Sequence, residues 1–434
     1  MIKLAIKKRN WLLAAVLAAT ATISAIGTVQ GGEVSLEKDI LEPVPPPVER
    51  FPNLWEEGKF NVNIRLRYEY ADQQTFSPSN AFTGRIRLGY TTGKFYGFNA
   101  MAEFEGTGTP DIYSYRAANI SGPVDKVNVP DPQSAELNRL WLAYTNFDST
   151  LKGGRQRIIL DNARFVGNVG WRQNEQTYDA IRLDSKFIPD LTFNYAYLKR
   201  VIRIFGSQAY GPTADFQSDS HLVNAKYDFA DWLSLSGYAY LLDLDNSVVS
   251  IGNKTFGAFA AGSVPLAEKT SLDYRVEYAN QSDWRGAPVG YNANYVHTVV
   301  TGKYAGYSLE FGFELLGTDS GIAAFQTPLG TNHKFNGWAD RFLTTPNGGL
   351  RDYYVGATAK LPWDFGTGLY YHYFTDDLNG REYGQEVDAV VSKKLGYGFS
   401  ALAKFAYYDG SNSAIPSGFS QDTVKAWFQI EYNY

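Results

Sequence analysis

Arginine side chains are concentrated in the first half of the chain, and three pairs of them stand two residues apart. The set is Arg65, Arg67, Arg85, Arg87, Arg139, Arg155, Arg157 and Arg182. A guanidinium group is planar and permanently charged, and it donates parallel hydrogen bonds that fit a carboxylate or a phosphate. If these side chains share one face of the fold, the pattern predicts a surface that attracts anions.

Further charges of both signs are expected on the same face. The basic residues are Arg275, Lys303, Lys360, Lys404 and Lys425, and the acidic residues are Glu103, Glu105, Asp273, Glu277, Glu310, Glu314 and Asp388. One interpretation is a mutually neutralising network that keeps a wall hydrated and rigid, and it fits any single residue. The other is a surplus of positive charge on one wall, which fits the early arginines as a group.

Residues suited to catalysis or metal binding are sparse. The sequence contains no HExxH or GxSxG motif, and its four histidines are widely spaced, at His221, His297, His333 and His372. The stretch DLDN, residues 243–246, fits either a calcium-binding loop or an acidic solvated loop. The absence of cysteine excludes disulfides, thiolate chemistry and a lipid-modified N-terminus. We therefore expect no enzyme, no cofactor and no metal, with a lipid-hydrolysing barrel enzyme as the alternative.

The N-terminus has the pattern of a secretory signal peptide. Four basic residues precede the apolar run WLLAAVLAATATISAI, namely Lys3, Lys7, Lys8 and Arg9. The run is short for a membrane-anchoring helix, which is the alternative interpretation. We place the signal at residues 1–31, with cleavage between about Ala21 and Gly32. Residues 32–58 are predicted to form a proline-rich periplasmic leader.

Removal of the predicted signal makes the chain more acidic. It takes four positive charges away, so the formal charge changes from -5 to -9, which is -5 minus 4. A nucleic-acid-binding protein is expected to present a basic surface. The charge therefore argues against a nucleic-acid partner.

From Lys59 onward, apolar and polar residues alternate in segments of about ten residues separated by turn residues. A period of two is typical of strands with two different faces. In VKAWFQIEYNY, the last segment, one face comprises Val424, Ala426, Phe428, Ile430, Tyr432 and Tyr434, and the other Lys425, Gln429, Glu431 and Asn433. The alternation predicts about eighteen strands, over residues 59–70, 82–91, 95–105, 137–147, 151–160, 177–186, 190–200, 220–229, 233–243, 253–263, 270–280, 293–303, 306–316, 352–361, 364–374, 385–394, 397–408 and 422–434.

The connections between these strands are alternately short and long. Short ones include TTGK, FDST, IPD, FADW and GYG, and long ones cover residues 106–136, 161–176 and 317–351. The pattern predicts an all-β fold, a transmembrane antiparallel β-barrel over residues 59–434 in the bacterial outer membrane, with short periplasmic turns and long extracellular loops. The alternative is a secreted β-sandwich or propeller. Tyrosines near strand ends fit the aromatic belt of a membrane barrel, namely Tyr68, Tyr70, Tyr90, Tyr144, Tyr278, Tyr432 and Tyr434.

In such a barrel, the two faces of each strand have different surroundings. The apolar face contacts lipid, and the opposite face lines the lumen. The early arginines would then face the lumen and favour the passage of anions through a narrow, partly desolvated channel.

Two stretches resemble the alginate export family of outer-membrane porins. They are GGRQRIILDNARFVGNVGWRQNEQTYDAIRL, residues 153–183, and FQTPLGTNHKFNGWADRFLTTPNGGLRDYYVG, residues 325–356. The resemblance implies an eighteen-stranded barrel with an arginine-rich pore for an anionic uronate polymer, constricted by long loops that fold over or into the lumen. It makes pore or pore-loop candidates of Arg155, Gln156, Arg157, Asp161, Arg164, Trp171, Arg172, Gln173 and Asp179 in the first stretch, and of His333, Lys334, Asn336, Trp338, Asp340 and Arg341 in the second.

The long connection at residues 317–351 contains TNHKFNGWADRF, which is too aromatic for a disordered segment. Folded into the barrel mouth, it would offer aromatic surface to sugar rings, and Lys334 and Arg341 to carboxylates. Alternatively, Phe335 and Trp338 pack the loop against the inner wall. Both interpretations can hold at once.

These observations predict a porin for an anionic oligosaccharide or polysaccharide, such as an alginate-like uronate. The alternatives are a small-solute porin for carboxylates or sugars and a plugged barrel with a structural or adhesive role. The expected partners are outer-membrane lipid and the anionic saccharide, and the sequence points to no particular periplasmic protein.

Overall fold

The computed structural model describes residues 57–118, 120–411 and 418–434. Its eighteen long strands are β1 (Lys59–Gln73), β2 (Ser79–Thr91), β3 (Phe98–Gly108), β4 (Ser134–Asn146), β5 (Ser149–Gln156), β6 (Thr177–Ser185), β7 (Leu191–Ile202), β8 (Phe216–Ala230), β9 (Leu233–Asp245), β10 (Ser250–Ala267), β11 (Thr270–Asp283), β12 (Asn292–Tyr304), β13 (Tyr307–Leu316), β16 (Leu350–Leu361), β17 (Phe365–Thr375), β18 (Glu382–Gly396), β19 (Phe399–Gly410) and β20 (Thr423–Asn433). The short elements are β14 (Thr318–Asp319), β15 (Ala323–Ala324) and the 3-10 helices η1 (Gly211–Thr213), η2 (Asn332–Lys334) and η3 (Pro362–Asp364).

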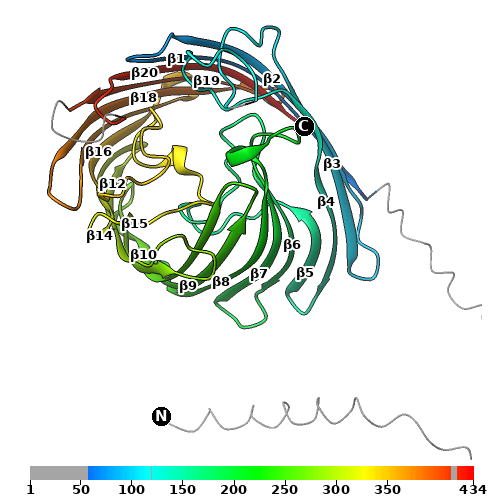
Figure 1. Ribbon diagram of the computed structural model, residues 1–434. Coiled ribbons are helices and arrows are strands. Elements are labelled where there is room, and N and C mark those ends of the chain that lie inside the picture. The colour runs from blue at the N-terminus through cyan, green and yellow to red at the C-terminus, as the bar shows by residue number, and fades with distance from the viewer. Residues whose placement is uncertain (1–56, 119, 412–417) are drawn as a thin grey trace, which may run out of the picture. The chain divides into compact units, whose positions relative to one another are not determined.

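The long strands form one antiparallel sheet in which each strand pairs with its neighbours in the sequence. The sheet closes into a barrel because β1 also pairs with β20, from Asn63 opposite Asn433 to Gln73 opposite Thr423 (Figure 1). The predicted closed barrel of eighteen strands is confirmed. None of the helices in the described residues has the length and apolar character that crossing a bilayer requires.

The two faces of β1 differ as the alternation predicted. Arg65 and Arg67 are 8% and 1% exposed, whereas the intervening Ile64 and Leu66 are 39% and 49% exposed. A charged inner face and an apolar outer face are expected when lipid surrounds a barrel. Alternation along a single strand is therefore enough to assign its faces here.

All eighteen predicted strands are present, with ends within four residues of the predicted ones. One of the largest differences is in β5, which was predicted to continue to Leu160 but ends at Gln156. The predicted end was wrong because the chain leaves the wall there. Ile158 and Leu160 are buried inside the barrel and do not face lipid.

The connections differ in length between the two ends of the barrel. At one end they are short, at residues 92–97, 147–148, 186–190, 231–232, 268–269, 305–306, 362–364 and 397–398. At the other end, long connections cover residues 109–133, 157–176, 203–215 and 317–349. Residues 74–78 and 246–249 at that end are short too, so the alternation is less regular than expected.

Two long connections fold into the ring of strands, and we call them loop A (residues 157–176) and loop B (residues 317–349) (Figure 1). The backbone N–H of Gly167 in loop A donates to the carbonyl oxygen of Leu329 in loop B at 2.9 Å. Such pairing satisfies backbone groups that would otherwise be buried without partners. The two loops are therefore braced against each other.

Loops A and B share a hydrophobic cluster with inward-facing residues of the wall. The loops contribute Ile158, Leu160, Phe165, Val166, Phe325, Leu329 and Phe342, and the wall contributes Tyr178, Leu198, Tyr238, Tyr240, Tyr295, Phe374, Tyr408 and Trp427. The expectation that apolar residues face lipid and polar residues face the lumen is wrong for this part of the wall. The docked loops replace water there, so apolar side chains are stable on the inner face.

The predicted signal peptide, residues 1–31, lies outside the described residues, as do residues 32–56 of the predicted leader.

Candidate functional site

The predicted arginines of β1 and β2 reach the backbone of loop A. Arg65 donates to the carbonyl oxygens of Gly170 and Trp171 at 3.1 and 3.2 Å, and Arg85 donates to that of Gln173 at 3.3 Å. A guanidinium group has five N–H donors, so it can serve several carbonyl groups at once. These arginines hold loop A in the lumen.

Ten of the eleven arginines predicted as pore or pore-loop residues also have a carboxylate within 4.0 Å. The pairs are Arg65 with Glu431, Arg67 with Asp131, Arg85 with Glu431, Arg87 with Glu105, Arg139 with Glu103, Arg155 with Asp179, Arg157 with Glu175, Arg164 with Glu314, Arg172 with Glu69, and Arg182 with Asp184. The arrangement fits the interpretation of a mutually neutralising network. Charge on the inner wall therefore depends on which partner of each pair is exposed.

Arginines outnumber acidic residues around one cavity of about 470 Å³, which we call the arginine cavity. Its charged lining residues are Arg65, Arg85, Arg87, Arg139, Arg157, Glu103 and Glu431. The side chains of Arg157 and Arg139 are 32% and 18% exposed, whereas their partners Glu175 and Glu103 are 0% and 3% exposed. Arg139 and Arg157 therefore cover their carboxylates and present their own charge to the cavity. Glu431, in contrast, is 16% exposed, whereas its partners Arg65 and Arg85 are 10% and 1% exposed.

Glu175 in loop A stays ionised beneath these arginines. Burial alone would raise the pKa of its carboxyl group, but Arg87 and Arg157 hold that pKa well below its ordinary value. Arg157 donates to both carboxylate oxygens at 2.6 Å, and Asn138 adds a further hydrogen bond at 2.8 Å. Glu175 thus fixes the position of Arg157 at the cavity.

Seven predicted cations do not line the arginine cavity, namely Arg67, Arg155, Arg164, Arg172, Arg182, Lys334 and Arg341. Arg155 and Arg182 are paired with Asp179 and Asp184 on the wall. Lys334 donates to the carbonyl oxygen of Asn162 at 3.1 Å, and Arg341 donates to that of Gly418. Lys334 and Arg341 thus each bind a peptide carbonyl, and Lys334 also lines a second cavity, described below. Their role as cations facing a carboxylate stays a prediction.

Arg172 joins loop A to three other parts of the chain. It lies 3.0 Å from Glu69 in β1, 3.7 Å from Asp131 in the connection between β3 and β4, and 2.9 Å from Asp340 in loop B. Its side chain is 4% exposed. Burial alone would lower the pKa of Arg172, but the three carboxylates raise it. We call this set the Arg172 cluster.

Asp340 also links the Arg172 cluster to Lys425 in β20 and to His333 in loop B. Its carboxylate also accepts from Lys425 at 2.8 Å and contacts His333 Nδ1 at 2.6 Å. Burial alone would raise the pKa of Asp340, but His333, Lys425 and Arg172 hold it well below its ordinary value. Asp340 is therefore ionised at neutral pH.

His333 is neutral, since burial lowers its pKa well below the ordinary value. Lys404 Nζ lies 2.7 Å from His333 Nε2. An ammonium group can only donate, so Nε2 accepts and Nδ1–H donates to Asp340. Lys404 Nζ also lies 3.6 and 4.4 Å from the ring centroids of Trp338 and Trp171. We call Lys404 with His333, Trp338 and Trp171 the lysine cage. It ties both loops to β19 through hydrogen bonding and cation–π contact.

The aromatic residues of loop B serve two purposes, as the two open interpretations allowed. Phe342 packs against Phe374, Tyr383 and Phe419, with ring centroids 4.6, 5.6 and 5.4 Å away, and docks the loop. Trp338 instead lines a second cavity of about 630 Å³, together with Phe335. Phe342 therefore docks loop B, whereas Phe335 and Trp338 present a surface to the cavity.

This second cavity, the aromatic cavity, combines ring faces with polar groups. Its lining includes Trp171, Phe335, Trp338, Tyr354, Tyr370, His297 and Glu310. Among the described residues, Trp171 Nε1 and His297 Nδ1 have no hydrogen-bond partner. Gly170 of loop A lines both this cavity and the arginine cavity, so the two lie next to each other.

Sequence reasoning missed several residues at the centre of this arrangement. Glu69 has the parity of Arg65 and Arg67 along β1, and this could have identified it. Trp427 has the parity of Lys425 and is fully buried, at 0% exposed, next to His333 with ring centroids 5.7 Å apart. A large aromatic residue on a polar face was the available signal of packing inside the barrel.

The histidines and the acidic DLDN stretch have structural contacts. His372 Nδ1 lies 2.9 Å from Asp352, and Asp243 accepts from Arg285 at 3.1 Å. No group of three or more potential metal ligands occurs in the described part of the chain.

Comparisons with known proteins agree with this architecture. Residues 53–316 match the family model described as Alginate export. No curated protein matches the chain. The crystal structure of Acinetobacter baumannii OccAB4 has a TM-score of 0.65 at 14% identity, over 88% of this chain and 99% of that one. Pseudomonas aeruginosa OccK9 (OpdG) has a TM-score of 0.67 at 14% identity, over 88% and 99%.

A third similar structure contains a ligand. Pseudomonas aeruginosa OpdK with vanillate has a TM-score of 0.65 at 13% identity, over 87% of this chain and 99% of that one. At such low identity the likeness to solved structures shows the shared fold alone.

Proposed function

The chain belongs to the alginate export family and is an outer-membrane porin, and from this premise we propose that it passes anionic saccharides of the uronate class through the lumen. The observation that carries the proposal is the arginine cavity, where the guanidinium groups of Arg139 and Arg157 are exposed and their carboxylate partners are covered. Fixed positive charge in a narrow, partly desolvated passage raises the local concentration of anions.

The neighbouring aromatic cavity supports a saccharide over a simple anion. A uronate unit has a carboxylate and a ring with apolar C–H faces and hydroxyl groups. The carboxylate would interact with Arg139 and Arg157, and the ring would pack on Trp338 and Tyr370.

The first prediction concerns charge selection. In the double variant Arg139→Gln, Arg157→Gln, the anion-to-cation permeability ratio is expected to fall by about threefold or more, because two exposed cations are lost and the carboxylates of Glu103 and Glu175 remain. The measurement is the reversal potential of the purified porin in a planar bilayer under a KCl gradient.

The matched control is Arg155→Gln, Arg182→Gln, which removes the same charge from pairs outside the arginine cavity. It should leave the reversal potential close to that of the wild type. An equal change in both double variants would mean that the cavity has no special role in selectivity.

A small-solute porin for carboxylates is the second candidate function. Loops A and B occupy much of the interior, and the cavities of about 470 and 630 Å³ have the size of small-molecule sites. The similar fold of OpdK with vanillate, a small carboxylate, also favours it.

The second prediction separates these candidates. A uronate tetrasaccharide is expected to block the single-channel current at a concentration about tenfold lower than a neutral tetrasaccharide, because it gains interactions with the arginine cavity. Glucuronate and glucose serve as monomer controls. Selective block by glucuronate with equal, weak block by both tetrasaccharides would favour the small-solute porin. A barrel with no conductance at all would instead have a structural role.

We propose no catalytic role for the buried histidines. His333 and His372 each contact a carboxylate, Asp340 and Asp352, within the packed interior. These contacts serve the docking of loop B and the packing of the wall.

A further inference from the structure

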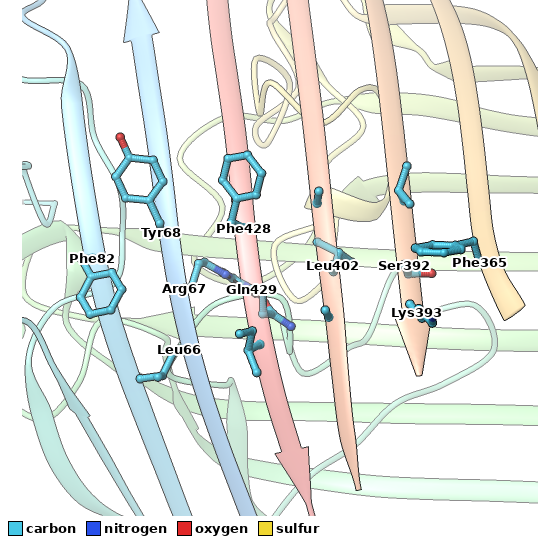
Figure 2. Close-up of a pocket in the computed structure, with 14 residues that line it drawn as sticks. Leu66, Arg67, Tyr68, Phe82, Phe365, Ser392, Lys393, Leu402, Phe428 and Gln429 are labelled. Carbon is cyan, nitrogen blue, oxygen red and sulfur yellow. Dashed lines mark hydrogen bonds between the residues drawn. The ribbon is translucent and has the colours of Figure 1, made fainter. Parts of the chain in front are cut away.

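The outer wall contains a groove over strands β17 to β20, β1 and β2, with a volume of about 590 Å³ (Figure 2). Its floor is formed by Ala401 and Ala403 of β19. These alanines lie between the larger Phe399 and Phe405 in the outward row of the same strand, both more than 40% exposed. The groove is therefore a depression in the lipid-facing surface, with its floor on β19.

The sides of the groove are set by the register of the sheet. Ala403 lies opposite Phe428 of β20, and Ala401 lies opposite Ile430. On the other side the same alanines lie opposite Val391 and Lys393 of β18. Large side chains thus border the floor on both sides, and Figure 2 shows Phe428 and Lys393 on opposite sides of the groove.

Lys393 is an unusual residue for this surface. It shares the outward parity of Val387, Val391 and Leu395, which are 40%, 43% and 51% exposed. Its Nζ lies 4.5 Å from the ring centroid of Phe365, and none of the ion pairs in the described part of the chain includes it. A lysine on the lipid face of a barrel is unfavourable unless it reaches polar groups at the membrane interface.

The position of Lys393 along the strand identifies that interface. It lies three residues before the end of β18 and next to the short turn at residues 397–398. Short turns of such barrels are periplasmic. The ammonium group is therefore close to the level of the lipid headgroups of the periplasmic leaflet.

We propose that the groove binds one phospholipid of the periplasmic leaflet, with an acyl chain along Ala401 and Ala403 and the phosphate paired with Lys393. The acyl chain would bury apolar surface against the lining of the groove, and the ammonium group of Lys393 would pair with the phosphate. A second copy of the protein fits less well, because it would have to bring a carboxylate to Lys393. The outward residues that flank the groove are Leu66, Phe82, Phe428 and Ile430, which are apolar.

The proposal is tested by native mass spectrometry of delipidated, folded porin titrated with dioleoyl phosphatidylglycerol. The wild type is expected to retain one lipid, and Lys393→Gln should weaken its binding about fivefold, corresponding to one lysine at a charged headgroup. Binding of dioleoylglycerol, which lacks the phosphate, should be unchanged in Lys393→Gln. The variant Ala403→Leu, which fills the floor, should weaken both lipids.

Lys394→Gln is the matched control, since Lys394 is adjacent and has the opposite parity in β18. It should bind phosphatidylglycerol like the wild type, and all variants should keep the shifted mobility of a folded barrel on unheated gels. Equal binding by Lys393→Gln and the wild type would overturn the proposal. A stable dimer that Ala403→Leu dissociates would overturn it too, because the groove would then be an interface between copies.

Discussion

Arg172→Met is expected to undock loop A and to enlarge the conducting passage. The substitution removes the cation shared by Glu69, Asp131 and Asp340, all of them buried. Breaking a buried ion pair by removing one partner costs about 3–5 kcal/mol, because the remaining charges lose their compensation. The measurements are single-channel conductance, which should become larger and noisier, and limited proteolysis, which should cut within residues 157–176.

Two further variants test the reason for this effect. Arg182→Met removes a partly exposed arginine paired with Asp184, and it should cost less than about 1 kcal/mol and leave conductance unchanged. Arg172→Lys keeps the charge but cannot reach three carboxylates with a planar fork, so an intermediate effect is expected. Wild-type conductance and proteolysis in Arg172→Met would show that the Arg172 cluster does not hold loop A.

The Arg172 cluster also predicts how loop docking responds to acid. Because the pKa of Asp340 is held well below its ordinary value, its contribution to stability is fully present above the ordinary pKa of a carboxyl group. It is lost only as the pH falls through the lowered pKa. Mild acidification should therefore leave the loops of the wild type docked.

The strands could be predicted because each carries its own signal. Strand β20 lies between β1 and β19. Its Phe428 and Ile430 are 60% and 51% exposed on the lipid face, whereas Lys425 faces inward and is buried. Alternation of this kind depends on neighbours two residues apart, so the sequence alone reveals it. The strand count and the assignment of faces followed from it.

Faces could not be assigned where both are apolar. In β9, Tyr238 and Tyr240 point inward and are 5% and 2% exposed, while Leu235 is 44% exposed on the other face. The inner face is apolar there because Phe165 of loop A packs on it, with ring centroids 5.2 and 6.1 Å from the two tyrosines. A contact between distant segments leaves no periodic trace in either one.

The sequence predicted which residue types form the candidate site, but not the ion pairs that these residues make. The basic character of Arg139 and Arg157 suggested anion attraction, and the sequence did not reveal that Glu103 and Glu175 lie beneath them. Partners separated by about 18 to 36 positions are brought together by sheet register and loop docking. The exposed fraction of each partner decides the local charge, and it is a property of the packed structure alone.

Replacement of residues 333–342 by two glycines is expected to have the largest effect on conductance. The ends of this segment are close, since Asn332 donates to the carbonyl oxygen of Leu343 at 2.9 Å, so a short link can join them. The change removes Trp338 and Phe335 from the aromatic cavity and His333 from the lysine cage. Conductance should rise by about twofold or more as the passage widens.

The same variant separates recognition of charge from recognition of the sugar ring. Arg139 in β4 and Arg157 at the start of loop A are retained, so the reversal potential should still indicate a preference for anions. The uronate tetrasaccharide should lose most of its blocking strength, because the ring faces of Phe335 and Trp338 are gone. If block by the tetrasaccharide persisted at the wild-type concentration, the aromatic cavity would not be its binding site, and the arginines alone would account for recognition. If conductance also stayed unchanged, loop B would lie outside the conducting path.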